Sequence, residues 1–383
     1  MRRLAVTPRV DLARRANDLG FTLYRPEGPD YWDETACYGF TLGQIENDLE
    51  APTAELHQMA LHLVDRASRD EAILRRLQIP AHAWDTVRAS WRARAPSLYG
   101  RFDFSYDGQS PAILLEYNAD TPTALYEAAV FQWVWLEDMI GSGALPSDAD
   151  QFNSIHDMLV ALMRGLGAKR LHLAGLRDNA EDALCLDYLA DCAVQAGLSA
   201  TPLAMSEIGL KDGRFVDAAD APIEHLFKLY PWEWVWAEPF GREPAMARTR
   251  FLEPAWKAVL SNKGMLALLH EMDPRHPNIA PAFFDDDPRR ASLGSRYARK
   301  PLLSREGANI VLIDGPATAS QPGPYGGEGH VLQALAPLPD FGGRRPVVGS
   351  WVIGEEAAGI GMREGDGPIT TDAARFVPHA ILD

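Results

Sequence analysis

A pair of strand-like runs joined by a short turn is the sequence feature that most constrains the fold. The runs YGRFDFSY (99–106) and PAILLEYN (111–118) meet at DGQSP, a segment rich in turn-forming residues. This combination is typical of a β-hairpin. We centre its turn between Gln109 and Ser110, and this choice determines which residues of the two strands face each other.

The register of this hairpin brings polar side chains together. Asp103 is expected opposite Glu116, and Arg101 opposite Asn118. Two carboxylates directly across a ladder repel each other unless a positive charge lies between them. Two carboxylates and an amide carbonyl are hard oxygen ligands, which suit Mg²⁺ better than zinc. The residues alone leave two interpretations open: a metal site, or an exposed charged hairpin with an Arg101–Asp103 ion pair.

The end of the second strand, LLEYNADTPT, raises a further question. Asp120 continues the polar face of this strand. It either orders the turn into the next helix or faces a substrate. That helix is expected from about Ala124, with Thr121 or Thr123 as its N-cap.

The remaining chain alternates between helix-like and strand-like patterns. Helical periodicity runs from about Ala51 to the segment WDTVRASWRARA. Residues 150–215 read as helix, strand, helix and strand, which predicts a small parallel α/β subdomain. In PWEWVW, the residues Trp232, Trp234 and Trp236 occupy alternate positions, as on one face of a strand.

The second half of the chain offers basic side chains for a phosphate site. Beyond Pro254, a helix precedes short strands that alternate with glycine-rich turns. Each basic residue taken alone suits a solvated surface, but together with the acidic hairpin they favour a nucleotide site. The strand VLQALAPL adds Gln333, which can hydrogen-bond a purine. The basic candidates are Lys263, Lys300, Arg305 and Arg363.

Composition narrows the function classes. The 383-residue chain is 46% hydrophobic and 23% charged, and its formal net charge is −16. This charge argues against binding nucleic acid or an anionic membrane, and suits either solubility or a cationic small-molecule partner. The N-terminus lacks the apolar core of a signal peptide, and the chain contains no run of about 18 apolar residues that would span a membrane. We expect a cytoplasmic protein without a disulfide framework, in which Cys185 and Cys192 are buried thiols on one face of a helix.

Several long segments resemble the glutathionylspermidine synthase family, in its synthetase part and without the amidase domain. They are RFDF…LLEYNADTPT, LYPWEW, EPAWKAVLSNK, RKPLLSREGAN, APLPDF and GSWVIGEEAAGIGMRE…ITTDAARFVPH, and they cover nearly the whole chain. The resemblance implies an α+β ATP-grasp ligase with an inserted small parallel α/β subdomain that is similar to a pre-ATP-grasp domain. It implies one synthetase-like unit over residues 1–383. Within it we expect a metal-binding hairpin and helix at 95–140, the small α/β subdomain at 165–225, and a nucleotide-binding and lid region at 254–380.

The resemblance also implies roles for individual residues. Three residues of the hairpin would hold Mg²⁺, two lysines and a glutamine would bind ATP, and three arginines would act on the transferring phosphate and the acyl phosphate. In the implied reaction, a carboxylate attacks the γ-phosphate of ATP and an amine then displaces phosphate to give an amide. In the order just given, the residues are Asp103, Glu116 and Asn118; Lys263, Lys300 and Gln333; and Arg305, Arg363 and Arg101.

A glutathione-like peptide and a polyamine-like amine are the substrate classes that the resemblance implies. TPTALYEA stands where the bifunctional members have a more serine-rich segment, so Asp120, Thr121 and Thr123 are candidate substrate contacts. Glu181 and Asp182 are candidates to receive the amine, although a helix N-terminus favours acidic residues without any ligand. Nothing resembles the amidase domain, so amide hydrolysis is not expected. The alternatives are a non-catalytic ATP-binding homologue, or a ligase for a different peptide and amine.

Overall fold

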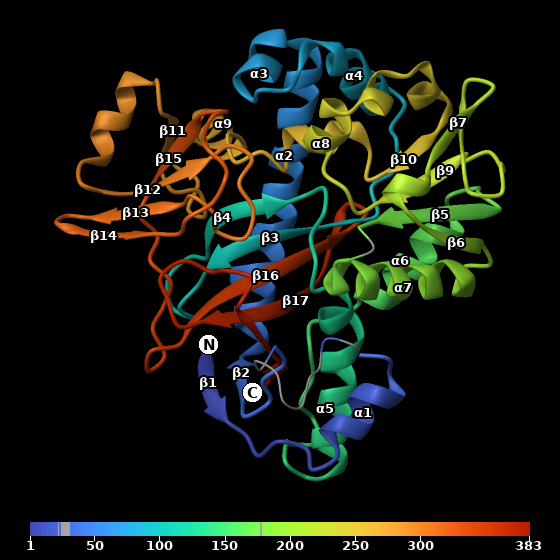
Figure 1. Ribbon diagram of the computed structural model, residues 1–383. Helices are drawn as coiled ribbons and strands as arrows, with labels where there is room; N and C mark the ends of the chain where they lie inside the picture. The colour runs from blue at the N-terminus through green and yellow to red at the C-terminus, as the bar shows by residue number, and fades with distance from the viewer. Residues whose placement is uncertain (22, 24–30, 177) are drawn as a thin grey trace.

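Helices and strands are mixed along the described chain, as expected for an α+β protein. The structure is a computed structural model that describes residues 1–21, 23, 31–176 and 178–383. Figure 1 shows a central antiparallel sheet, a second antiparallel sheet to its upper left, and a parallel sheet to its right. These three sheets surround the region in which the sequence predicts the site.

The central sheet contains the hairpin in the predicted register. Asp103 pairs with Glu116 and Arg101 with Asn118, and a β-bulge follows Asp103. The first hairpin strand is buried along its whole length, and the second forms one edge of the sheet. Across the sheet, the strands are β18 (Arg375–Val377), β17 (Glu356–Gly365), β16 (Arg345–Ile353), β3 (Tyr99–Ser105) and β4 (Ile113–Asn118).

The second antiparallel sheet carries two of the predicted ATP-binding residues, Lys300 and Gln333. Helix α9 (Met265–Met272) packs against two of its strands. Across the sheet, the strands are β11 (Ala282–Phe284), β15 (His330–Ala334), β12 (Arg296–Pro301), β13 (Val311–Asp314) and β14 (Ala317–Ser320).

The third large sheet is parallel. Two of its strands, with helices α6 (Ile155–Arg164) and α7 (Ala180–Gln195), confirm the predicted alternation of helices and parallel strands. Two later strands join the sheet, so it continues to residue 252, beyond the expected limit at 225. Across the sheet, the strands are β10 (Arg250–Leu252), β9 (His225–Lys228), β5 (Arg170–Gly175) and β6 (Ser199–Ala204), and a separate hairpin pairs β7 (Gly209–Lys211) with β8 (Arg214–Val216).

The two ends of the chain meet in a three-stranded sheet. Strand β1 (Arg2–Ala5) pairs antiparallel with β2 (Ala36–Phe40), and β19 (His379–Ile381) joins β2 in parallel. Two nitrogen atoms of Arg3 donate to the Glu364 carboxylate, at 2.7 and 3.1 Å. This ion pair ties the terminal sheet to β17 of the central sheet.

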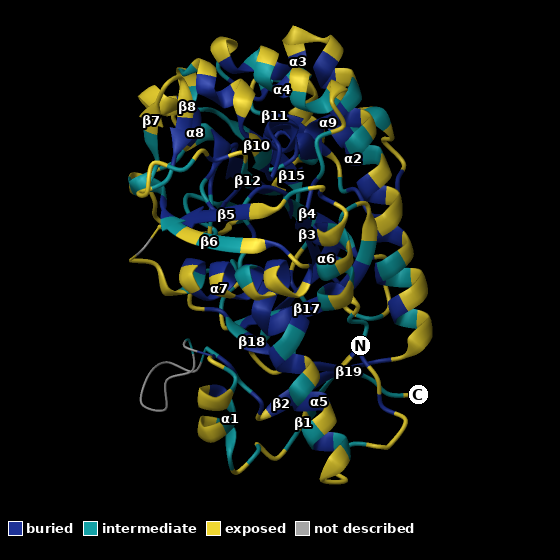
Figure 2. Ribbon diagram, turned by 90° about the vertical axis from the view of Figure 1, so that its right-hand side faces the viewer, coloured by how far each residue is buried: buried dark blue, intermediate teal, exposed yellow. Residues whose placement is uncertain are grey.

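The helical region predicted after Ala51 forms a long helix beside the central sheet. Helix α2 (Ala51–Arg69) buries Leu56, Ala60 and Leu63, whose spacing is that of an amphipathic helix. Figure 2 shows α2 at one edge of the molecule, with exposed residues on its outer side. Among the described helices, none combines the length and apolar character that crossing a membrane requires. Other α-helices are α1 (Leu12–Asp18), α3 (Glu71–Arg76), α4 (Trp84–Arg92) and α5 (Gln132–Gly141). Shorter helical turns are η1 (Gln44–Glu50), η2 (Ala81–Ala83), η3 (Glu127–Phe131), η4 (Met205–Glu207), η5 (Pro239–Arg242), η6 (Pro244–Arg248), η7 (Ala255–Val259) and η8 (Pro288–Leu293).

One predicted strand is a helix. The tryptophan-rich segment forms α8 (Trp232–Ala237), so the prediction of a strand face was wrong. Trp232 and Trp236 are one helical turn apart, are buried, and stack with ring centroids 5.2 Å apart. Trp234 points elsewhere and is 37% exposed. Alternate tryptophans are therefore compatible with a helix that buries every fourth residue.

Cys185 and Cys192 are buried, as predicted, and so is Cys37. All three are free thiols. Burial raises the pKa of Cys185 and of Cys192 to about 12, so both stay protonated at neutral pH. They serve as small apolar residues of the interior.

Candidate active site

A cavity of about 470 Å³ lies where the three large sheets meet. Its walls come from β3 and β4, from β12 and β15, from the ends of β5 and β9, and from the loops around residues 305–310 and 368–370. Of the predicted site residues, only Lys263 and Asp120 lie outside its wall. Those on the wall are Arg101, Asp103, Glu116, Asn118, Thr121, Thr123, Glu181, Asp182, Lys300, Arg305, Gln333 and Arg363.

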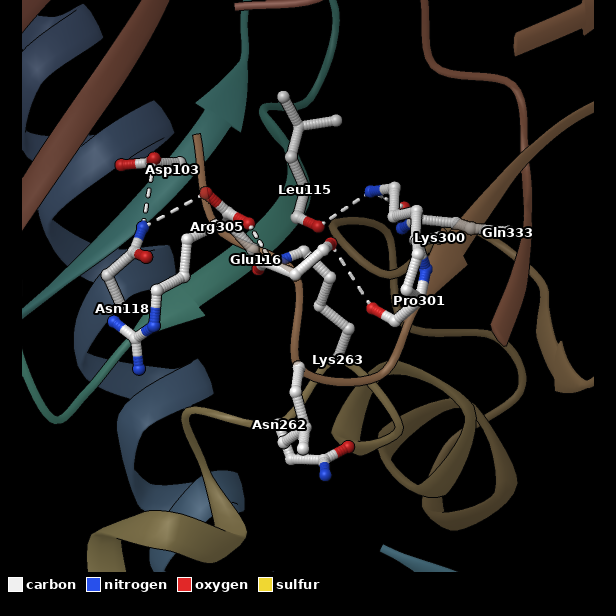
Figure 3. A network of polar contacts seen from close by, with 12 residues as sticks. Asp103, Leu115, Glu116, Asn118, Asn262, Lys263, Lys300, Pro301, Arg305 and Gln333 are labelled. Atoms are coloured by element: carbon white, nitrogen blue, oxygen red, sulfur yellow. Dashed lines mark hydrogen bonds and ion pairs between the residues drawn. The ribbon is translucent and has the colours of Figure 1, made fainter. Parts of the chain in front are cut away.

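Asn118 bridges the two facing carboxylates of the hairpin. Its Nδ2 donates to Asp103 Oδ2 and to Glu116 Oε1, at 3.1 Å each (Figure 3). The Asp103 side chain is only 3% exposed, and that of Glu116 is 26% exposed. A neutral amide cannot offset two negative charges, so cations must do so.

Two arginines neutralise Asp103. Arg101 donates from Nε to Asp103 Oδ1 at 2.7 Å and from Nη2 to Oδ2 at 3.2 Å. Arg363, which lies in strand β17 of the same sheet, also donates to Asp103 Oδ2. Arg101 also donates from Nη1 to the carbonyl of Thr123, at 2.7 Å. This arginine therefore links the acidic hairpin to the segment that follows β4.

Lys263 neutralises Glu116. Its Nζ lies 2.8 Å from Glu116 Oε2 and also donates to the carbonyl of Ser304. Burial favours the neutral form of Glu116, but the charges of Lys263 and Lys300 outweigh it. They hold the pKa of this carboxyl well below its usual value.

The oxygen chemistry of this cluster fits Mg²⁺. Two carboxylates and an amide oxygen are the ligand types that a hard cation prefers. Within the described residues, no group of three or more His, Cys, Asp or Glu side chains is arranged to hold a metal, so Asn118 has to complete the set. In this arrangement its amide nitrogen faces the carboxylates, and binding a metal requires its oxygen to turn toward them. The carboxylates also have to exchange Lys263 and Arg363 for the metal.

Lys300 and Gln333 connect the second antiparallel sheet to the edge of the central sheet. Lys300 Nζ donates to the Leu115 carbonyl at 2.8 Å and to Gln333 Oε1 at 2.7 Å (Figure 3). Gln333 Nε2 donates to the Leu114 carbonyl at 2.8 Å. Burial lowers the pKa of Lys300 to about 8; the charge of Glu116 opposes this shift and that of Lys263 adds to it.

Arg305 reaches across the cavity to two partners. Its Nη1 donates to Thr121 Oγ1 at 2.6 Å, and its Nη2 donates to Glu233 Oε1 at 2.9 Å. Thr121 therefore contacts Arg305 and is not a helix cap. The helical region after it begins without a side-chain cap, and Ala124 has a positive φ of 64°, so the predicted N-cap at Thr121 or Thr123 was wrong.

Asp120 lies beneath the cavity and not on its wall. Its Oδ1 accepts from Lys228 Nζ at 2.7 Å, and its Oδ2 accepts from the Trp232 N–H at 2.9 Å. Both charged side chains are fully buried. Of the two expectations for Asp120, the contacts favour ordering of the chain after β4 over contact with a substrate.

Glu181 and Asp182 lie on the cavity wall and also begin helix α7. The Asn179 side chain caps this helix by accepting from the N–H groups of Glu181 and Asp182, at 2.9 and 3.1 Å. Asp182 Oδ2 accepts from the Leu176 N–H at 3.3 Å, and burial raises the pKa of Asp182 to about 6. Their place at a helix N-terminus and their place on the cavity wall are therefore compatible.

Comparison with known proteins identifies the family of the chain. The family model described as glutathionylspermidine synthase, pre-ATP-grasp, matches residues 3–382. The chain belongs to the glutathionylspermidine synthase family.

The following relatives of the chain are named as ligases or synthetases. A Haemophilus influenzae protein provisionally named an acid–amine ligase is 40% identical over the full length of both chains. A trypanothione synthetase of Crithidia fasciculata is 25% identical and matches 82% of this chain but 52% of its own. A bifunctional glutathionylspermidine synthetase/amidase of Escherichia coli is 25% identical, over 88% of this chain and 58% of its own. The chain thus spans little more than half of the latter two relatives.

A solved structure supports the fold at greater distance. A glutathione synthetase-like effector of Globodera pallida matches 97% of both chains with a TM-score of 0.57, at 10% sequence identity. At this identity the likeness concerns the fold alone.

Sequence reasoning missed two residues around the cavity of this glutathionylspermidine synthase family member. Glu233 was not selected as a site residue because its segment was interpreted as a strand of aromatic core residues. The segment is a helix, in which the Glu233 side chain reaches Arg305. Lys228 is the last residue of the buried strand β9. Its partner Asp120 is 108 residues away in the sequence, so no local pattern indicates this pairing. A lysine directly after the apolar residues Leu226 and Phe227 was the available signal, since lysine is seldom fully buried without a partner.

Proposed function

We propose that this protein is an ATP- and Mg²⁺-dependent carboxylate–amine ligase of the ATP-grasp type. It would form an amide through an acyl phosphate. One observation carries the proposal: a single cavity is lined by the acidic hairpin and by basic side chains from two other parts of the chain, Lys300 and Arg305. The name of the relative at 40% identity, an acid–amine ligase, supports the same reaction class.

The chain's residues divide into groups in this proposal. Asp103, Glu116 and Asn118 would hold Mg²⁺, which when bound offsets the negative charge of the phosphates. Positive side chains aimed at the phosphates would stabilise charge that moves during transfer. Lys263 and Lys300 would bind phosphates or adenine, with Gln333 on the adenine side; Arg305 and Arg363 would contact the transferring phosphate, and Arg101 would steady the acyl phosphate.

The ion pairs suggest why metal and nucleotide would bind together. Lys263 is engaged with Glu116, and Arg363 with Asp103. Lys263 becomes free for a phosphate only if another cation takes over the charge of Glu116. Otherwise a carboxylate with a strong preference for its charged form loses its nearest counter-charge.

A glutathione-like peptide and a polyamine-like amine remain the leading substrate classes, because the more distant relatives are glutathionylspermidine and trypanothione synthetases. We assign Thr121 and Thr123 to the acid substrate. Glu181 and Asp182, on the wall formed by the carboxyl end of β5 and the start of α7, are assigned to the amine. In this proposal, the hairpin and helix at 95–140 bind the metal, and the region at 254–380 binds the nucleotide and forms the lid. The parallel α/β part at 165–225 contributes Glu181 and Asp182 to the amine site.

A coupled assay for ADP release tests the proposal. Peptides with a free carboxylate and amines would be supplied in pairs, with ATP and Mg²⁺. We expect ADP and phosphate in equal amounts, and only when acid and amine are both present. Tight ATP binding without ADP release for any pair would instead identify a non-catalytic nucleotide-binding protein, and release with unrelated pairs would identify a ligase for other substrates.

A further inference from the structure

Two neighbouring residues after β4 face two neighbouring residues of α8. Asp120 accepts the Trp232 N–H, and the next residue, Thr121, shares Arg305 with Glu233. The two segments are therefore joined twice, once in the interior and once on the cavity wall. We call the contacts of Asp120 with Lys228 and Trp232 the inner junction. The contacts of Arg305 with Thr121 and Glu233 form the outer junction.

We propose that Glu233 and Asp120 are positioning residues that hold Arg305 over the cavity. The inference rests on the proposed function, in which Arg305 contacts the transferring phosphate. Glu233 acts directly on the guanidinium, and Asp120 acts by fixing α8 and Thr121 relative to each other.

The inner junction is rigid because it is buried and charged. Asp120 and Lys228 are both fully buried, with 2.7 Å between Oδ1 and Nζ. Lys228 also donates to the Tyr230 carbonyl at 2.9 Å, and its ammonium lies 4.4 Å from the centre of the Trp232 ring. Separating such a pair leaves an uncompensated charge in the interior, which is strongly unfavourable. The start of α8 is thus held firmly to the end of the metal-binding hairpin.

The outer junction is more accessible. The side chains of Arg305 and Glu233 are 30% and 19% exposed. Thr121 and Glu233 accept from different terminal nitrogens of Arg305, so together they set the plane of the guanidinium as well as its place. With one partner removed, the group can rotate about the other.

The loop that carries Arg305 is also confined on its far side. Gly307 has a positive φ of 73°, and a Cβ at this residue would lie 2.6 Å from the Thr370 carbonyl oxygen. Only glycine permits this close approach of the 305–310 loop to the segment at 368–370. The Arg305 loop is therefore placed between this segment and α8, and Glu233 sets the α8 side.

Hydrogen exchange of the loop tests the positioning without any enzyme assay. We would compare Glu233→Ala and Glu233→Gln with Glu238→Ala, which removes a charge just past the end of the same helix, where the carboxylate accepts from the Tyr230 hydroxyl. Amides of residues 303–310 should exchange up to about fivefold faster in Glu233→Ala, because opening of the loop no longer has to break the ion pair between Arg305 and Glu233. Glu233→Gln, which retains an acceptor, should lie between, and Glu238→Ala should match the wild type. Unchanged loop exchange in Glu233→Ala would overturn the proposal.

The inner junction has its own variant. Asp120→Asn alone strands a buried Lys228 and is prone to unfold, so Asp120→Leu with Lys228→Met removes both charges together and also removes the acceptor of the Trp232 N–H. The double variant should remain folded and yet show faster exchange in 303–310. Unchanged exchange in a folded double variant would remove Asp120 from the proposal.

Kinetics then separate positioning from general structural damage. Glu233→Ala should lower kcat about tenfold with KM for ATP within about twofold, since a misplaced group costs the transition state more than binding. The double variant Glu233→Ala with Arg305→Ala should be no slower than Arg305→Ala alone, because Glu233 acts through Arg305. Independent, additive losses would contradict the proposal. Faster loop exchange in a protein that releases no ADP with any acid and amine would leave the positioning intact and refute the ligase assignment.

Discussion

Lys263 Nζ lies 2.8 Å from Glu116 Oε2, so a proposed phosphate ligand and a proposed metal ligand neutralise each other. Lys263 is therefore not free to bind a phosphate, and Glu116 is not free to bind Mg²⁺, until both the nucleotide and the metal are present. This relationship links the affinities of the site for Mg²⁺ and for nucleotide.

Removing Lys263 should loosen that link. In Lys263→Met, Glu116 loses its counter-charge, and Mg²⁺ alone should bind about tenfold more tightly than to the wild type. The same variant should bind ATP more weakly. Calorimetric titrations with MgCl₂ and with ATP measure both changes, and weaker Mg²⁺ binding in Lys263→Met would contradict the assignment of Glu116.

Glu116→Ala should abolish turnover while the fold survives. We expect kcat to fall at least ~100-fold, the scale for losing a key electrostatic group of an active site. The fold should survive because the hairpin keeps its backbone pairing, although some stability is lost because Lys263, whose side chain is 6% exposed, loses its counter-charge. The ADP assay and thermal unfolding report the two effects. Asp85→Asn is the control, since the Asp85 side chain is 98% exposed; full activity of Glu116→Ala would remove the metal assignment.

Nucleotide affinity should depend on the charge of Lys300. Because the pKa of Lys300 is about 8, the side chain is positive below this pH and neutral above it. ATP affinity should therefore fall as pH rises from 7 to 9.5, by up to about tenfold per unit above pH 8. Lys300→Arg stays charged over this range and should bind with a flat profile. Parallel profiles of the two proteins in a titration series would show that Lys300 does not contact the nucleotide.

Glu127 should make stability fall as pH rises. Burial raises the pKa of this carboxyl from 4.5 to about 7, although Tyr31 donates a hydrogen bond to it. The folded state thus binds the proton more tightly than the unfolded state, and stability is lost as pH rises from about 4.5 through about 7. Relative to Glu127→Gln, the wild type should lose about 3 kcal/mol of unfolding free energy across this window. Urea unfolding at pH 5, 6, 7 and 8 measures the difference, and a constant gap between the two proteins would refute it.

A second buried ion pair should be worth far more than an exposed one. Lys257 Nζ lies 2.9 Å from Glu253 Oε2, with both side chains fully buried. Lys257→Met leaves this carboxylate uncompensated and should cost about 3–5 kcal/mol. Lys211→Met breaks the exposed pair with Asp220 and should cost less than about 1 kcal/mol. Denaturant unfolding of both variants compares them, and equal losses would contradict the argument from burial.

The hairpin was predictable because its information is local. The turn residues and the strand length determine the register, and Asp103 and Glu116 face each other as expected. The parallel pair of β5 and β6 followed in the same way from alternating patterns. Neither result needed any contact between segments far apart in the sequence.

The pairings across the cavity were not predictable in this way. Lys263, Lys300 and Arg305 were selected by charge and by resemblance, but nothing in the sequence indicated that Lys263 meets Glu116 or that Arg305 meets Glu233. Such contacts depend on how the three sheets pack. The secondary structure of the tryptophan segment was predicted wrongly for a related reason. Its sequence is compatible with both a strand and a helix, and the burial of Trp232 and Trp236 by residues distant in sequence favours the helix.

The contacts of Lys300 and Gln333 have a consequence for association between molecules. Strand β4 is an edge strand, and such an edge offers unpaired backbone groups to strands of other chains. Here the Leu115 and Leu114 carbonyls are bonded to the Lys300 and Gln333 side chains, and the Leu114 N–H donates to the Asn278 carbonyl. Side chains assigned to ATP thus also occupy the backbone carbonyls of a sheet edge, which leaves these carbonyls unavailable to a strand from another copy of the chain.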